Sequence, residues 1–234
     1  MPALYVFLMD YMLKKRIISL IFPTRCPICS EVIFPHEDFC GKCREEITPY
    51  TSKNSISGAD SFTAAFEYNG KISPAIILLK QGIKGNAVYA LGKALAKSLE
   101  NNGMSQRIDV IIPVPLYKSD KRQRGFNQAE LIAKEVGRQL KIDVSADTVE
   151  KIRKTKAQKT LTQKERKVNL KDAFEVKFPE KIKGKRVLLI DDVCTTGSTL
   201  SNIARILRNS GAAEIHCAVC CKTPSIKKEV DVND

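Results

Sequence analysis

One stretch of the chain reads Val187-Leu-Leu-Ile-Asp-Asp-Val-Cys-Thr-Thr-Gly-Ser-Thr199. Its apolar start predicts a buried parallel strand over 186–190, and two acids and a turn of small hydroxylated residues follow. A helix is expected directly after the turn, because apolar residues recur at helical spacing at Leu200, Ile203, Ala204 and Leu207. In open α/β sheets, ligands bind where the strands end. The stretch therefore predicts a ligand site.

The two halves of this stretch suit two parts of one ligand. The N–H groups and hydroxyls of residues 196–199 form a concave anion site at the start of the helix, which fits a phosphate. Asp191 and Asp192 suit the hydroxyl groups of an adjacent sugar, or a Mg²⁺ ion coordinated by that sugar. The dinucleotide pattern G-x-G-x-x-G and the nucleotide-loop pattern G-x-x-x-x-G-K-[ST] are both absent from the stretch. The simpler alternative is an ordinary turn capped by Thr and Ser.

The surrounding sequence alternates strands and helices. Further strands are predicted at Val110–Val114 and Ile215–Cys220, and helices at Ser73–Lys80, Asn86–Glu100 and from about Asn127 to Leu140. This alternation is typical of an α/β fold. We expect a mostly parallel sheet with helices on both faces.

Much of the positive charge falls in two segments. The chain has 39 Lys plus Arg against 26 Asp plus Glu, a formal charge of +13, which favours an anionic partner. After the stiff Pro113-Val-Pro115 exit, a basic turn at Lys118–Arg124 could surround a pyrophosphate or form a solvated face. The candidate cations in this turn are Lys118, Lys121, Arg122 and Arg124. Lys151–Lys171 has nine Lys or Arg residues and is expected to be a long mobile loop.

Eight cysteines divide into two groups of four. Cys26, Cys29, Cys40 and Cys43 form two C-x2-C pairs separated by ten residues, a spacing typical of one structural Zn²⁺. Disulfides are the alternative, and a reducing cytoplasm disfavours them. The other cysteines, on or near an apolar strand, are expected to act as small buried hydrophobes. We expect a helix or tail over 1–22, a zinc module over 23–50 and a Ser-rich connector over 51–61.

The acidic stretch resembles the phosphoribosyl pyrophosphate (PRPP) motif of type I phosphoribosyltransferases. The resemblance implies that Asp191 and Asp192 bind the ribose hydroxyls. It also implies that the 5′-phosphate is bound by Thr195, Thr196, Gly197, Ser198 and Thr199. The segments Ile112-Pro-Val-Pro115 and Arg122-Gln-Arg-Gly-Phe-Asn-Gln-Ala-Glu130 are similar to the hallmark of the ComF family. Members of that family pair a small zinc finger with a type I phosphoribosyltransferase-like domain, which implies such a domain over 62–234.

Two functions stay open at this point. The resemblance implies binding of PRPP with Mg²⁺ and transfer of its phosphoribosyl group to an unidentified acceptor. The ComF family is also associated with DNA uptake, which implies binding of single-stranded DNA or of a helicase partner in competence. No apolar run reaches the ~18–20 residues of a membrane span, and the start of the chain lacks the order of a signal peptide, so we expect a cytoplasmic protein.

Overall fold

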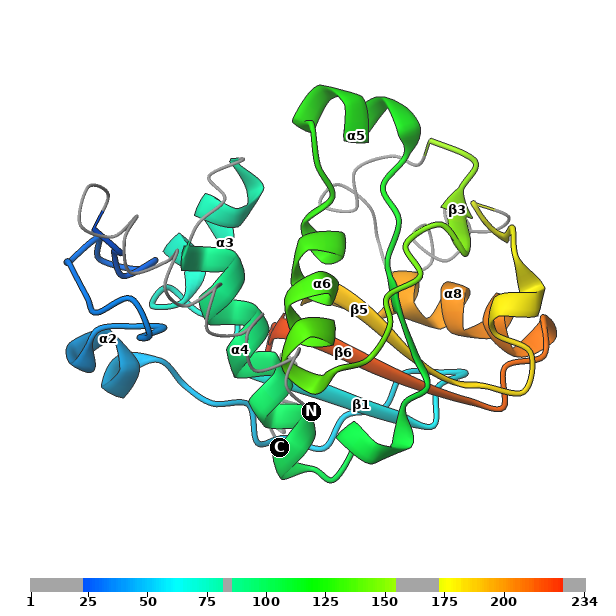
Figure 1. Cartoon of the computed structure of the whole chain (residues 1–234), viewed down its shortest axis with the longest axis horizontal. Helices are drawn as coiled ribbons and strands as arrows, with labels where there is room; N and C mark the ends of the chain where they lie inside the picture. Colours follow the sequence, from blue (N-terminus) through cyan, green and yellow to red (C-terminus); the bar gives the residue numbers. More distant parts are fainter. Residues whose placement is uncertain (1–22, 82–85, 155–172, 225–234) are drawn as a thin grey trace, which may run out of the picture.

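A computed structural model describes residues 23–81, 86–154 and 173–224 (Figure 1). Its centre is a sheet of four parallel strands in the order β1-β6-β5-β2. The apolar stretch at 187–190 is fully buried within this sheet, as the sequence predicts. The strands are β1 (Ser61–Glu67), β2 (Val110–Pro113), β5 (Arg186–Cys194) and β6 (Glu214–Lys222).

Helices cover both faces of the sheet (Figure 1). Successive strand residues point to opposite faces, so Leu188 and Ile190 pack with one group of helices while Val187 and Leu189 pack with the other. The first face holds α3 (Ser73–Lys80), α4 (Asn86–Asn101) and α6 (Gln128–Leu140), and the second holds α8 (Ser198–Asn209). The predicted fold class, a parallel α/β sheet with helices on both faces, is confirmed.

The basic turn predicted at Lys118–Arg124 is a helix, α5 (Lys118–Arg124), and the prediction is wrong in this respect. Lys, Gln and Arg are good helix formers. The preceding Tyr117 is the N-cap and has the extended backbone that is usual for a residue just before a helix. Gly125 ends it in the left-handed conformation, with φ +76°, and its N–H donates to the carbonyl of Lys121. The cations therefore stand on a helical turn rather than along a loop.

Short elements complete the described chain. The strands β3 (Val149–Lys151) and β4 (Phe174–Val176) form an antiparallel pair beside the sheet, so Lys151 belongs to a strand rather than to the predicted loop. Residues 155–171 of that loop and the helix or tail predicted over 1–22 lie outside the described residues. The remaining elements are α2 (Gly41–Glu46) and the 3₁₀ turns η1 (Ser105–Arg107) and η3 (Pro179–Lys181).

The cysteine-bearing segment packs against the rest of the protein. Phe39 is buried and meets Phe66 of β1 edge to face, with 5.9 Å between ring centroids. The Asn86 side chain at the start of α4 donates hydrogen bonds to the carbonyls of Arg25 (3.2 Å) and Asp38 (3.1 Å). These contacts attach the module to the helices and strands that carry the rest of the fold. In the described ranges, no helix has the length and apolar character needed to cross a bilayer.

Candidate functional site

The turn between β5 and α8 is shaped by Gly197. This residue has φ +77°, a backbone conformation that residues other than glycine rarely adopt. A Cβ atom at this position would also lie 2.5 Å from Cδ1 of Ile56, which comes from the connector and is buried beneath the turn. The hydroxyls of Thr196 and Ser198 approach to 2.9 Å above it. The structure thus brings the predicted phosphate-binding residues together at the carboxyl end of β5.

Asp191 and Asp192 lie directly before this turn. The backbone N–H of Asp192 donates to Oδ1 of Asp191 at 2.8 Å, and the N–H of Val193 donates to Oδ1 of Asp192 at 2.7 Å. Burial raises the pKa of the Asp191 carboxyl well above its usual value, and the neighbouring Asp192 charge raises it further. The charge of Asp191 is thus poorly compensated, and sugar hydroxyls or a cation would stabilise its ionised form.

Lys80 at the end of α3 forms an ion pair with one of these acids. Its Nζ lies 3.3 Å from Oδ2 of Asp192. Sequence reasoning missed this contact, because nothing near Lys80 in the chain distinguishes it from other surface lysines. Only the packing of α3 against the sheet places it there.

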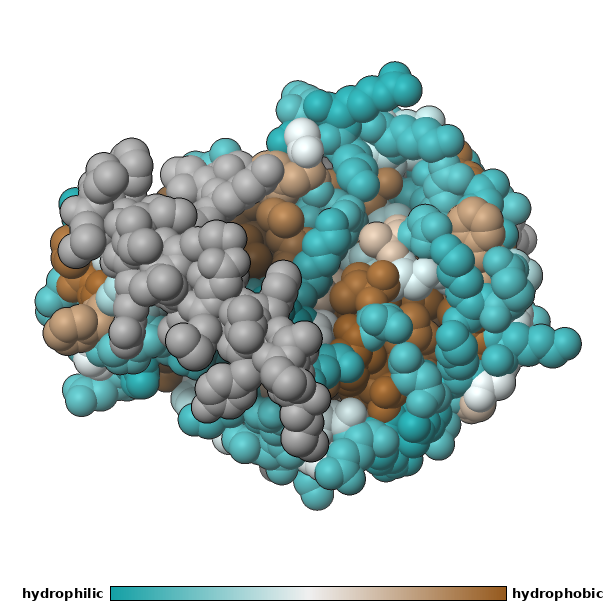
Figure 2. All heavy atoms as spheres, viewed as in Figure 1, coloured by the Kyte–Doolittle hydropathy of each residue, from teal (hydrophilic) through white to brown (hydrophobic). Residues whose placement is uncertain are grey.

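Two neighbouring cavities share the acids as a common wall. One, of about 240 Å³, extends from Asp191 and Asp192 over the turn to Lys151 and Phe174. The other, of about 300 Å³, extends from the same acids toward Lys80, Arg124 and Gln128. In Figure 2, hydrophobic atoms are visible between α6 and α8, with hydrophilic side chains around them. The arrangement offers an end lined by the turn, which suits a phosphate, then an acidic centre and a cationic end.

The predicted basic residues differ in their positions. Arg124 lines the second cavity. Lys118 pairs with Glu150 at 2.7 Å and its side chain is 73% exposed, while Arg122 lies exposed on α5. Neither Lys118 nor Arg122 is among the residues that line the two cavities, so the structure brings one of these three cations to the acids.

Two further residues line the cavities: Gln128, to which the sequence assigned no role, and Lys151, which it placed only within a long basic loop. Gln128 is only 3% exposed, and its Nε2 donor has no acceptor among the described residues. It lies in the first turn of α6, next to its N-cap Asn127, a position that the quoted Asn-Gln-Ala-Glu segment could have suggested. Lys151 faces the other cavity, and burial lowers the pKa of its ammonium group, partly offset by the charges of Asp120 and Asp191.

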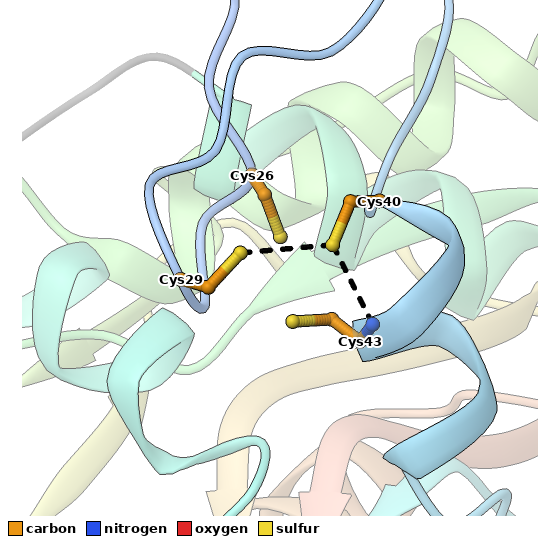
Figure 3. Close-up of side chains that lie close together, drawn as sticks. All are labelled: Cys26, Cys29, Cys40 and Cys43. Carbon is orange, nitrogen blue, oxygen red and sulfur yellow. Dashed lines mark hydrogen bonds between the residues drawn. The ribbon is translucent and has the colours of Figure 1, made fainter.

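The four N-terminal cysteines converge on one point (Figure 3). Their sulfur atoms all lie within 4.8 Å of one another, and the Sγ atoms of Cys29 and Cys40 are 3.6 Å apart. Zn–S bonds of about 2.3 Å in a tetrahedron place sulfurs roughly 3.8 Å apart, so Cys26, Cys29, Cys40 and Cys43 fit a structural Zn²⁺. The N–H of Cys43 donates to Sγ of Cys40 at 3.5 Å, and this hydrogen bond holds the N-cap Cys40 at the start of α2.

The other cysteines are buried in or at the ends of β5 and β6. Within the described part of the chain, no further cluster of potential metal ligands includes them. Burial raises the pKa of the Cys194 thiol to about 11, which keeps it protonated at neutral pH. They are, as expected, small apolar residues of the core: Cys194, Cys217, Cys220 and Cys221.

A third cavity lies beside the turn between β5 and α8. Its volume is about 860 Å³, and it runs between the connector and the exposed side of α8. It shares Thr196 and Ser198 with the turn. Arg205 lines it, is exposed, and forms no ion pair within the described ranges, whereas Arg208 is bound to Asp60 at 2.5 Å.

Comparison with known proteins agrees with both parts of the chain. Residues 84–234 match the phosphoribosyl transferase domain, and residues 17–55 match the double zinc ribbon domain. Among solved structures, adenine phosphoribosyltransferase from Thermoanaerobacter pseudethanolicus aligns with 64% of this chain and 85% of its own, at 20% identity and a TM-score of 0.39. The family assignment rests on the sequence matches.

Curated relatives match over most of their length. The DNA utilization protein YhgH of Escherichia coli K12 is 30% identical over 204 residues, covering 86% of this chain and 85% of YhgH. Competence protein F of Haemophilus influenzae is 33% identical over 206 residues, covering 81% and 86% of the two chains. Competence protein ComFC of Bacillus subtilis is 33% identical over 105 residues, 44% of this chain and 40% of ComFC. With its four-cysteine cluster and its parallel sheet, the chain belongs to the ComF/YhgH family, in which a double zinc ribbon precedes a phosphoribosyltransferase domain.

Proposed function

We propose that the protein binds PRPP through Asp191, Asp192 and the turn at residues 195–199. The observation that carries this is the order of chemistry along the two connected cavities. A turn suited to a phosphate, a pair of acids and a group of donors follow one another, and both cavities share the acids. A 5′-phosphate, ribose hydroxyls and a pyrophosphate have the same order in PRPP.

The cationic end would hold the pyrophosphate. Lys80 and Arg124 supply positive charge, and the unpartnered Nε2 of Gln128 supplies a buried donor. A buried donor without an acceptor is costly, so a phosphate oxygen at this point would remove a penalty of the ligand-free protein. Lys118 and Arg122 would act at longer range, through the general positive field of α5.

Mg²⁺ fits the same centre. Carboxylate oxygens and a bound phosphate are the ligands that this ion prefers, and Asp191 and Asp192 offer two adjacent carboxylates, of which that of Asp191 is buried and poorly compensated. The ion would neutralise charge on the pyrophosphate. The protein residues that orient the ribose would be the same two acids.

A transferase reaction at this site would be a substitution at C1 of the ribose. A nucleophilic nitrogen of an acceptor forms the new bond to C1 as the C1–O bond breaks, and pyrophosphate leaves with the electron pair. The acceptor nitrogen then loses its proton to water. Lys80, Arg124 and Gln128 would stabilise the negative charge that develops on the leaving group.

Ligand-induced stabilisation tests the proposal. We expect millimolar PRPP with Mg²⁺ to raise the melting temperature of the zinc-loaded wild-type protein. The double variant Asp191→Ala/Asp192→Ala should lose this shift. Asp143→Ala is the matched control, because Asp143 is exposed and lines neither cavity. An absent shift in the wild type, or an equal shift in the double variant, would refute the proposal.

Handling of single-stranded DNA is a second candidate, favoured by the cavity along α8. This cavity continues from the phosphate-binding turn and presents Arg205, serine hydroxyls and Asn202. No aromatic side chain is among its lining residues, so it would contact the sugar–phosphate backbone rather than stack bases. The names of the relatives, DNA utilization protein and competence protein, are consistent with such a role.

Oligonucleotide binding separates the two candidates. Fluorescence anisotropy with a labelled thymidine oligonucleotide should show affinity that falls steeply with salt, and Arg205→Ala should weaken it. Lys97→Ala removes an equal charge from an exposed site on α4, outside this cavity, and serves as the control. Equal losses in both variants would mean general attraction to a basic protein, and would argue against the α8 cavity as the binding surface.

A further inference from the structure

A buried lysine lies beneath the phosphate-binding turn. Lys222 is the last residue of β6 and is only 7% exposed. Its Nζ donates hydrogen bonds to the carbonyls of Thr195, at 2.8 Å, and Thr223, at 2.6 Å. No carboxylate lies within ion-pair distance of it in the described part of the chain, so this buried positive charge has dipoles but no counter-ion as partners.

The next residue holds the same turn. The N–H of Thr223 donates to the carbonyl of Cys194 at 3.0 Å, and its hydroxyl lies 3.3 Å from that carbonyl. The hydroxyl is also 3.4 Å from the carbonyl of Thr195. The end of β6 therefore holds two successive carbonyls of the turn on one side.

This constraint sets the direction of the turn's N–H groups. In a planar trans peptide, the C=O of one residue and the N–H of the next point in opposite directions. When the carbonyls of Cys194 and Thr195 are directed to β6, the N–H groups of Thr195 and Thr196 are turned away from it. Thr195 lines the cavity that also contains the two acids.

The charge of Lys222 adds to this orientation. A buried charge is screened less than an exposed one, and it costs free energy when it has no counter-ion. A phosphate bound in the turn would bring negative charge close to it. The dianionic form of such a phosphate would gain the most electrostatic stabilisation from Lys222.

We infer that Lys222 is a positioning residue for the phosphate-binding turn, one that orients its N–H groups and makes it selective for a dianionic phosphate monoester. The inference rests on the proposed function, since it concerns the same site. It adds a residue that touches the turn from beneath and belongs to neither of the stretches that resemble family motifs.

Isothermal titration with ribose 5-phosphate and with PRPP tests the inference. Lys222→Met removes the charge and keeps the length of the side chain, and we expect about tenfold or greater loss of affinity for both ligands, from loss of a close charge. Lys222→Arg should keep most of the affinity. Lys97→Met, on exposed α4, is the control for a lost lysine charge and should bind like the wild type.

A pH series distinguishes the charge from a purely structural role. The second pKa of a phosphate monoester is near 6, so wild-type affinity for ribose 5-phosphate should increase as pH rises from about 5 to about 7. In Lys222→Met this increase should be smaller. Equal affinity in this variant, or an unchanged slope with pH, would overturn the inference while the proposed function stands. If the wild type binds neither ligand, the proposed function itself fails.

If Lys222→Met does not fold, Thr223→Val decides the positioning role. Valine removes the hydroxyl and keeps the shape and the backbone N–H. We expect a loss of severalfold in affinity, about the effect of one neutral hydrogen bond, with a melting temperature near that of the wild type. An unchanged affinity in this variant would contradict the role of the β6 end in orienting the turn.

Discussion

The two ends of the candidate site are built in different ways. The proposed phosphate-binding end and the acids come from one continuous segment, residues 191–199, at the junction of β5 and α8. The cationic end is assembled from α3, α5 and α6, which contribute Lys80, Arg124 and Gln128. The first end is therefore fixed by local backbone geometry, and the second depends on how three helices pack. Substitutions at the two ends should have different effects on stability and on ligand choice.

Removal of zinc should have the largest effect and should act mainly on the cationic end. The zinc module contacts α4 through Asn86 and β1 through Phe66, and α4 packs against α3, which carries Lys80. Structural zinc sites contribute roughly 10 kcal/mol or more of apparent binding free energy. We expect a strong chelator to lower the melting temperature, and PRPP binding to weaken more than binding of ribose 5-phosphate.

Elemental analysis provides the starting point for that experiment, with about one zinc per chain expected. Cys40→Ser should reduce zinc content and melting temperature together. Cys217→Ser is the control, because Cys217 lies in the sheet outside the cluster and should keep the zinc. If chelation weakened the binding of PRPP and of ribose 5-phosphate equally, the two ends of the site would not be separable in this way.

Gly197→Ala should disable the phosphate-binding end. The alanine would have an unfavourable φ and would place its Cβ against Ile56, so we expect destabilisation of about 1–3 kcal/mol and loss of ribose 5-phosphate binding. Gly125→Ala is an informative control, because φ is also positive there but no atom lies within 4 Å of the added Cβ. Chemical denaturation of both variants separates conformational strain from the clash. Equal losses would show that contact with Ile56 contributes nothing.

Asp191→Asn should have opposite effects on stability and binding. Because burial and Asp192 raise the pKa of Asp191 in the folded protein, the folded state binds a proton more tightly than the unfolded state. The wild-type free energy of unfolding should therefore fall as pH rises above the usual carboxyl pKa. The amide that replaces the carboxyl carries no charge, so the variant should be more stable than the wild type at neutral pH, and should bind PRPP about tenfold or more weakly.

The measurement is urea denaturation of both proteins, zinc-loaded and ligand-free, over a pH series. The difference in unfolding free energy between them isolates the titration of this carboxyl. It should grow in favour of the variant as pH rises. A variant less stable than the wild type at neutral pH would mean that Asp191 is compensated in the free protein, contrary to the proposed role.

Single substitutions at the cationic end should have the smallest effects. Arg124→Ala should weaken the binding of PRPP several-fold and leave the affinity for ribose 5-phosphate unchanged, because only PRPP has a pyrophosphate. Lys118→Ala should change either affinity less than twofold, because Lys118 is largely exposed and pairs with Glu150. Titration of both ligands into both variants checks this. A larger loss from Lys118→Ala would place the pyrophosphate near Lys118, at the start of α5, instead of near Arg124.

The contrast between a site end built from one segment and an end built from three helices also explains what the sequence can predict. The acids, the turn and the cysteine cluster are contiguous or regularly spaced, so their chemistry is visible in the chain, and the structure brings each set together. Strands of continuous apolar residues and helices with an apolar stripe were likewise predictable. Lys80 and Gln128 reach the site through tertiary packing, which no local pattern encodes. The helix α5 was missed because its residues are charged on all sides and have no apolar periodicity.

Through Ile56, the connector contributes to the core of the domain that follows it. The Ile56 side chain is buried in the same core as β5 and α8 and supports the turn below Gly197. The segment that joins the two modules is therefore a structural part of the second one. A fragment that begins at residue 62 would lack the side chain that packs against the turn between β5 and α8. Division of this protein for separate study, or exchange of its zinc ribbon with that of a relative, should therefore be made before residue 56.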